Sequence, residues 1–130
     1  MNRPPIIVTI NKFKKENWKD WIELDVKMLS KQQSNPYYIC EYVFNNTLEF
    51  QESSSLITNK IAQLFTACNN PNDYRIEFVV FYNNKAIVTM PCFYKTIMYN
   101  IKNNIDWLQR LIDAVKLSIS YIEANNKENN

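Results

Sequence analysis

The sequence predicts an α+β fold: an antiparallel β-sheet of five to six strands, with one short helix and one long C-terminal amphipathic helix packed on it. Short segments rich in β-branched and aromatic residues are separated by polar turns, one helical pattern interrupts them, and a longer one closes the chain. Strands and helices that are grouped rather than alternating are typical of this class. A length of 130 residues suits one domain. We expect it over residues 1–124, followed by a disordered polar tail at 125–130.

The composition excludes most enzyme classes. The chain contains no glycine and no histidine. Phosphate-cradling loops and nucleophile elbows need glycine, because only glycine fits their backbone positions. The usual nucleophile pairs and near-neutral proton shuttles need histidine. The sequence therefore predicts a non-enzymatic protein with no catalytic residues, no cofactor and no metal site.

The cysteines indicate a reducing compartment. Cys40, Cys68 and Cys92 are odd in number, far apart and set among apolar residues, so we expect buried thiols rather than disulfides. The first five residues lack the pattern of a signal peptide. No apolar run approaches the length of a membrane span. These features predict a soluble cytoplasmic protein that can also enter the nucleus.

The N-terminal half contains the first predicted strands. Residues 5–10 form a β-branched run, and a polar, basic connection follows. The next segment alternates apolar and polar residues, which is the period of a half-exposed strand. An aromatic strand then leads to an Asn45-Asn46 turn. The basic connection spans residues 11–19. The alternating strand is predicted at 21–29, the aromatic strand at 37–44 and a short strand after the turn at 47–51.

The centre of the chain predicts a short helix and a hairpin. Serines at 53–55 supply an N-cap, and the apolar residues that follow fall on one helical face as far as 67–69. Residues 74–82 carry apolar side chains on both faces, which is typical of a central strand. Asn83-Asn84 is a plausible two-residue turn. It leads into a strand at 86–90, which we expect Pro91 to end.

The longest predicted element is a helix over residues 93–125. Its apolar stripe alternates spacings of four and three, which places it along one side of an α-helix. At about 1.5 Å per residue, the stripe runs for roughly 40 Å, more than one sheet face needs. The helix either simply covers the sheet, the favoured interpretation, or overhangs it and docks a partner at one end. The stripe comprises Tyr94, Met98, Ile101, Ile105, Leu108, Ile112, Val115, Ile119 and Ile122.

Two charged groups could bind ligands. Asp20, Glu23, Asp25 and Glu41 could hold Mg²⁺ if adjacent strands brought them together, but the solvent face of an alternating strand explains them better. The cations of the 12–19 connection, interleaved with aromatic residues, could attract phosphates and stack bases. A net charge of only +2 argues against a basic footprint, so a solvated loop is favoured. The candidate nucleic-acid residues are Lys12, Lys14, Lys15, Trp18 and Lys19.

Aromatic residues are the other excess, with eight Tyr, seven Phe and three Trp. Those of the 37–44 strand alternate onto both faces, more than a single core face needs. Aromatic side chains with a polar end are enriched at protein interfaces. Core filling and partner binding both remain open as explanations. The candidate interface residues are Tyr37, Tyr38, Tyr42, Phe44, Trp107 and Tyr121.

The pattern of elements resembles that of the proteasome assembly chaperones of the fourth type. The similarity lies in the strand Ile6-Ile7-Val8-Thr9-Ile10 with Phe13 and Trp18 after it, the alternating strand at 22–29 and the aromatic strand at 37–44. It continues in the helix containing Ile61-Ala62-Gln63-Leu64, the strand at 76–81 and the closing helix. The resemblance covers about two-thirds of the chain. This chain departs from the family in having no glycines, a shorter middle and a longer last helix.

The resemblance implies a non-enzymatic chaperone that pairs with a related small subunit and supports α-ring formation by holding α-type proteasome subunits. It implies no catalytic residues. We therefore expect a protein-binding assembly factor, as a homodimer or heterodimer. One alternative is a nucleic-acid-binding module that uses the 12–19 connection. Another is a viral or lineage-specific accessory protein that binds a host factor.

Overall fold

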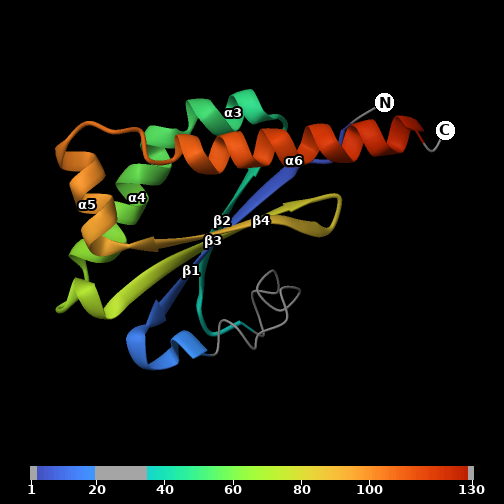
Figure 1. The fold of residues 1–130 in the computed structure, drawn as a ribbon. Coiled ribbons are helices and arrows are strands. Elements are labelled where there is room, and N and C mark those ends of the chain that lie inside the picture. The colour runs from blue at the N-terminus through green and yellow to red at the C-terminus, as the bar shows by residue number, and fades with distance from the viewer. Residues whose placement is uncertain (1–2, 20–34, 129–130) are drawn as a thin grey trace.

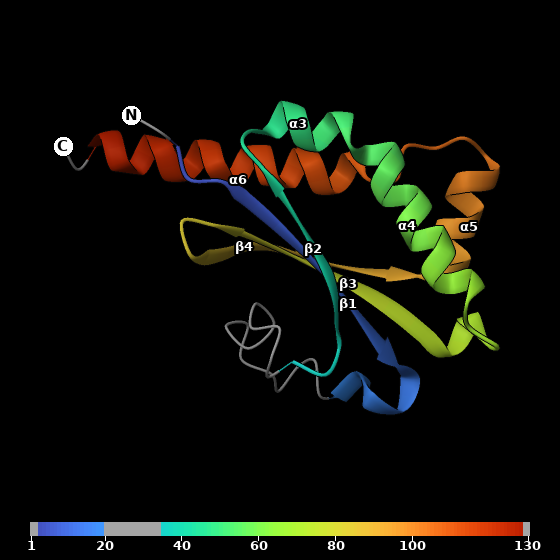
Figure 2. The same ribbon diagram turned by 180° about the vertical axis from the view of Figure 1, so that it is seen from behind.

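The computed structural model describes residues 3–19 and 35–128 and has an α+β fold. Its antiparallel sheet has four strands in the order β2-β1-β3-β4 rather than the predicted five to six, because the strand expected at 47–51 is helical and the one expected at 21–29 lies outside the described residues. Helices α3, α4 and α6 cover one face of the sheet, and α5 lies at one end (Figures 1 and 2). The strands are β1 (Ile6–Lys14), β2 (Tyr38–Phe44), β3 (Tyr74–Tyr82) and β4 (Lys85–Phe93), and the helices are α3 (Thr47–Glu52), α4 (Ser54–Thr66), α5 (Tyr94–Lys102) and α6 (Gln109–Glu128).

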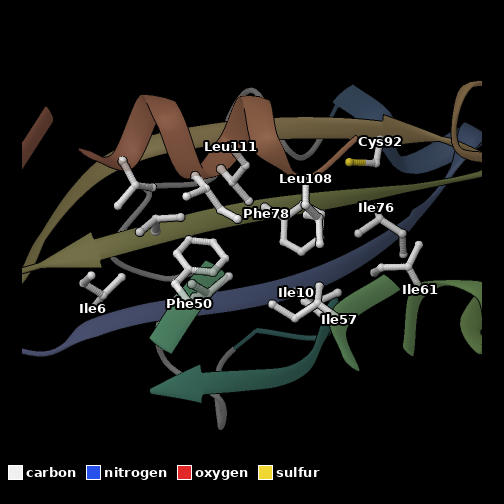
Figure 3. Packing of buried hydrophobic residues seen from close by; sticks show 14 of the residues in the cluster. Ile6, Ile10, Phe50, Ile57, Ile61, Ile76, Phe78, Cys92, Leu108 and Leu111 are labelled. Carbon is white, nitrogen blue, oxygen red and sulfur yellow. The ribbon is translucent and has the colours of Figure 1, made fainter. Parts of the chain in front are cut away.

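The main core lies between the helices and the sheet. Alternate residues of β1 and β3 point toward the helices, as the two-residue period of a strand requires. Figure 3 shows Phe78 and Leu108 at the centre of this layer, with Phe50 reaching in from α3. All three side chains are fully buried. The long helix is thus packed on the sheet, as the sequence predicted.

The strands at 37–44 and 74–82 are confirmed as β2 and β3. β3 lies between β1 and β4 and is buried on both faces, so its prediction as a central strand was correct. β1 is longer than predicted, because it continues to Lys14 through the segment expected to be a loop. Asn11 and Phe13 explain the extension, since both are fully buried on the face opposite the helices.

The strand predicted at 47–51 is wrong, because these residues form helix α3. Asn46 caps this helix: its side-chain oxygen accepts a hydrogen bond from the backbone N–H of Glu49 at 2.9 Å. The Glu49 carboxylate in turn accepts from the backbone N–H of Asn45 at 2.7 Å. This reciprocal pair resembles a capping box and overrides the strand-like pattern. The strand predicted at 21–29 lies entirely outside the described part of the chain.

The hairpin between β3 and β4 is confirmed. Asn83 and Asn84 have φ angles of 53° and 64°, the left-handed values that a type I′ turn requires. Pro91 does not end the sheet as predicted, since β4 continues to Phe93. An edge strand needs backbone hydrogen bonds on one side only, so it accepts a proline.

The Asn84 turn gives a first testable prediction. Asparagine tolerates the left-handed region better than other residues with a Cβ atom. We expect Asn84→Ala to lower the free energy of unfolding by about 1 kcal/mol, measured by urea denaturation. Asn72→Ala changes an exposed asparagine that is not among the residues with positive φ, and is the control. Equal stability of the two variants would contradict the turn assignment.

The predicted single helix over 93–125 is wrong in one respect: it is two helices, α5 and α6. α5 ends in a Schellman motif with Asn104 at φ 55°. The backbone N–H of Ile105 donates to the carbonyl of Asn100 at 2.8 Å, and that of Asn104 to the carbonyl of Ile101 at 3.2 Å. An asparagine here occupies the position that glycine usually takes. α6 continues to Glu128, into the segment predicted to be a tail.

Candidate functional site

The candidate interface aromatics separate into different environments. Phe44 and Trp107 are buried in the main core, where Phe44 stacks on Phe50 with ring centroids 5.1 Å apart. Trp107 lies 6.0 Å from the ring of Phe78. Tyr42 is half-buried and stacks on Phe44 at 6.2 Å. These three side chains fill and border the core, so they do not form an exposed partner surface.

Tyr37 and Tyr38 precede or begin β2 and are both half-buried. Tyr37 stacks on Phe13 with ring centroids 4.3 Å apart, on the sheet face opposite the helices. Its carbonyl accepts the backbone N–H of Lys12 at 2.9 Å. Tyr37 therefore secures the end of β1, a role the sequence did not predict.

The face of the sheet opposite the helices carries a buried polar chain as well as apolar residues. The Asn35 side chain donates to Asn11 Oδ1 at 2.7 Å, and the hydroxyl of Thr9 donates to the carbonyl of Val79 at 3.2 Å. All four residues are buried. Partners for buried polar groups are needed to offset their desolvation. This face is thus a second packed layer rather than a bare sheet surface.

Glu77 is the exception on that face, because few contacts offset the desolvation of its buried carboxylate. Its side chain is 1% exposed and lies 3.2 Å from Arg75 Nη2, but neither carboxylate oxygen has a hydrogen-bond partner among the described residues. Burial raises the pKa of Glu77 to about 7, and the nearby Arg75 guanidinium opposes that rise. The Arg75 guanidinium also lies 5.3 Å from the Trp18 ring centroid.

The candidate nucleic-acid residues are divided between the two faces. Lys12, Lys14 and Lys15 line one hollow of about 650 Å³. Trp18 points elsewhere: its indole N–H donates to the carbonyl of Phe13 at 3.3 Å, and its ring packs edge-on against Phe93 at 5.6 Å. Lys19 is exposed and does not line the hollow. The structure therefore brings three cations together but places Trp18 on the other face of the sheet.

The clearest exposed apolar surface lies on α6. Leu117 is 74% exposed and Tyr121 is 69% exposed, one helical turn apart. With Ile87, Ser118 and Ile122 they border an apolar hollow of about 510 Å³ beside β4. The C-terminal end of α6 extends past the β3–β4 hairpin (Figure 1). Of the candidate aromatics, only Tyr121 belongs to this surface. Leu117 was not predicted to belong to it, but its spacing of four residues from Tyr121 could have indicated this.

The candidate Mg²⁺ ligands are not assembled by the described structure. Glu41 is exposed on β2, while Asp20, Glu23 and Asp25 lie outside the described residues. Among the described residues, no cluster of three histidine, cysteine or carboxylate side chains could hold a metal ion. Cys40, Cys68 and Cys92 are free thiols. Burial raises the pKa of the Cys92 thiol, with Glu77 adding to that rise, which disfavours the reactive thiolate form.

No family model, curated protein or solved structure matches this chain. Within the part of the chain that the structure describes, no helix is both long and apolar enough to cross a membrane. The α+β architecture and the geometry above are thus the basis for assigning a function.

Proposed function

We propose that this chain is a non-enzymatic, protein-binding assembly factor that pairs with a similar subunit through the outward side of α6 and the open edge of β4. The observation that carries the proposal is the exposure of Leu117 and Tyr121 on a helix whose other side is buried in the core. Contiguous exposed apolar surface of this kind marks interaction sites.

The outward side of α6 has a second apolar pattern of its own, which we call the outer stripe. It consists of Ala114, Leu117, Tyr121 and Ala124, with spacings of three, four and three. That spacing is the seam of a two-helix coiled coil. Val115 and Ile119 lie on the opposite side, in the core.

The outer stripe is complementary to itself. When two copies of α6 pack antiparallel with Leu117 of one against Tyr121 of the other, Ala114 of each falls against Ala124 of the other. The alanines allow close approach where the helices cross, and the larger pair fills the centre. A two-fold interface needs this property, because the same residues must serve both partners.

The edge of β4 continues this surface. Among the described strands, β4 has a neighbour on one side only, so its outer backbone groups are open to pairing. Pro91 cannot donate a hydrogen bond, which disfavours pairing at that end of the strand. Ile87, at the other end, borders the hollow beside Leu117 and Tyr121. Strand edge and outer stripe therefore form one continuous patch.

The family resemblance supplies the partners to test first. They are a related small chaperone subunit and the α-type proteasome subunits, in the cytoplasm or nucleus. An assembly factor must release its client, so its affinity should be moderate. Binding of a host factor by an accessory protein would use the same patch. The nucleic-acid alternative would use the lysine hollow instead.

The first test of this proposal is the oligomeric state. We expect the wild-type protein to dimerise with rising concentration in sedimentation velocity, because the paired stripes bury Leu117 and Tyr121. Leu117→Asp should weaken dimerisation at least about tenfold, since it would bury an unpaired charge. Leu56→Asp is the matched control, because Leu56 is 59% exposed on α4, outside the patch. Equal weakening by both variants would contradict the assignment.

Disulfide trapping tests the antiparallel register. Neither Ala114→Cys nor Ala124→Cys alone should form a cross-linked dimer on mild oxidation, whereas a mixture of the two should. Wild-type protein under the same oxidant controls for Cys40, Cys68 and Cys92. A monomer at every concentration would exclude the homodimer. Binding of purified α-type subunits by wild type but not by Leu117→Asp would then support a heterologous partner.

A further inference from the structure

A second candidate surface arises where β1 runs past the end of α4. Ile6, Val8 and Ile10 point into the core beneath the helices. α4 ends at Thr66, and beyond it the same face of β1 continues as Lys12 and Lys14. The core gives way there to the hollow of about 650 Å³. We call it the lysine hollow.

The lysine hollow is formed by four segments. Its floor is the end of the sheet, where Lys14 pairs with Tyr74 of β3. One wall is the C-terminal end of α4, with Asn69 and Asn70 just beyond it. The two 3₁₀ turns, Lys15–Asn17 and Pro71–Asp73, complete it. Segments distant in sequence therefore converge on one concave site.

The lysine side chains gather over one aromatic ring. Lys12 Nζ lies 5.2 Å and Lys14 Nζ 6.0 Å from the centroid of Tyr74. Lys12 is half-buried and its Nζ lies 3.9 Å from Cys68 Sγ. The ring holds the two ammonium groups near each other through cation–π attraction. Lys15 adds a third cation from the adjacent turn.

Among the residues that the structure describes, no carboxylate forms an ion pair with these three cations. Among the described residues, the ion pairs within 4.0 Å are Arg3–Glu123 and Arg75–Glu77, and neither involves a lysine of the hollow. Glu16 and Asp73 also line the hollow but do not reach the ammonium groups to that distance. Gathering like charges is unfavourable, and a bound anion would relieve the repulsion.

We propose that the lysine hollow binds a small molecule with two or more phosphate groups, such as a nucleoside triphosphate. The volume lies in the range of small-ligand sites. Three ammonium groups can contact several phosphate oxygens, and the amides of Asn69 and Asn70 can donate further hydrogen bonds. The outer stripe lies toward the opposite end of the molecule (Figure 1), so this site is independent of the proposed function.

A compact ligand fits better than a nucleic-acid strand. Trp18, the side chain suited to stack a base, is engaged on the other face of the sheet. The Tyr74 ring is already covered by lysines. Glu16 and Asp73 at the hollow would repel the phosphates of a polymer that continues past it. An oligonucleotide is therefore an alternative outcome of the test.

The test is titration of the full chain with inorganic triphosphate, with ATP and with a mixed-sequence single-stranded oligonucleotide by calorimetry at low salt. We expect triphosphate and ATP to bind. The double variant Lys14→Gln/Lys15→Gln should lose at least about tenfold in affinity, since each lysine contributes a charge-assisted contact. Both side chains are exposed, so the variant should fold normally. Lys12→Gln should show a similar loss.

The control removes the same charge elsewhere. Lys95→Gln/Lys102→Gln changes two exposed lysines of α5 and should leave the affinity unchanged. Equal losses in the two double variants would mean attraction by net charge only and would overturn the site. No binding of triphosphate would also overturn it. Oligonucleotide binding that triphosphate fails to compete away would replace it with a nucleic-acid surface.

Discussion

Phe50→Ala is expected to lower the free energy of unfolding by about 3–5 kcal/mol, the cost of deleting a buried phenylalanine. Phe50 is fully buried, stacks on Phe44 at 5.1 Å and joins α3 to the core. Truncation would leave a cavity between α3 and β2 that a short helix anchored by one large side chain cannot easily close. Urea denaturation with comparison of midpoints and slopes is the measurement.

Leu48→Ala is the matched control for Phe50→Ala. Leu48 lies two positions earlier on the same helix but is 62% exposed, so its loss should change stability by no more than about 0.5 kcal/mol. A similar small effect at Phe50 would show that α3 is not anchored through this ring. A larger effect at Leu48 than at Phe50 would mean that α3 packs through its other side.

The elements that the sequence predicted correctly are those whose signals are local. β3 was predicted as a central strand because its residues are apolar on both faces. The structure confirms this, since β3 lies between two strands and is buried on both faces. The Asn83-Asn84 turn was predicted because asparagine tolerates positive φ. α4 was predicted from one apolar face, three of whose residues are buried, and from a serine N-cap, but Ser53 at that position makes no capping hydrogen bond through its side chain.

The errors arise where one polar side chain decides between two possible backbone conformations. Thr47 to Gln51 looks like a strand, but Asn46 and Glu49 close a helix-capping pair that pattern counting does not weigh. The C-terminal stripe continues in perfect register through Asn104, although the backbone turns there. Without glycine as a marker, an asparagine at the end of a helix looks like any polar surface residue.

The candidate sites were predictable only in part. Lys12 and Lys14 continue the alternation of the strand before them, which could have placed them on one face. Their meeting with Tyr74 depends on β1–β3 pairing, which no local pattern encodes. Aromatic composition could not separate Trp107, in the core, from Tyr121, on the surface. Tertiary packing makes that distinction.

Glu77 should make the stability of this protein depend on pH in an unusual direction. It is the one acidic residue of β3 and is fully buried. Burial raises its pKa from the ordinary value of 4.5 to about 7, against the opposing effect of Arg75. Below the lower value, the carboxyl is protonated in both the folded and the unfolded state. Above the higher value, it is ionised in both. Between them the unfolded state has released a proton that the folded state still holds.

The free energy of unfolding should therefore fall as pH rises through this window, because the folded state binds more protons. The shift corresponds to a loss of roughly 3 kcal/mol, at about 1.4 kcal/mol for each pKa unit. Most paired carboxylates act in the opposite direction, since their pKa values are lowered on folding. Urea denaturation at a series of pH values between these limits measures the slope.

Glu77→Gln should remove most of this slope, because the amide does not titrate. The amide carries no charge at any pH, so the variant lacks the ion pair with Arg75 that the wild type forms once Glu77 ionises above this window. Glu41→Gln changes an exposed carboxylate and should keep the wild-type slope. If Glu77→Gln also kept it, Glu77 would be ionised in the folded protein throughout. The Arg75 guanidinium would then offset the burial of this carboxylate in full.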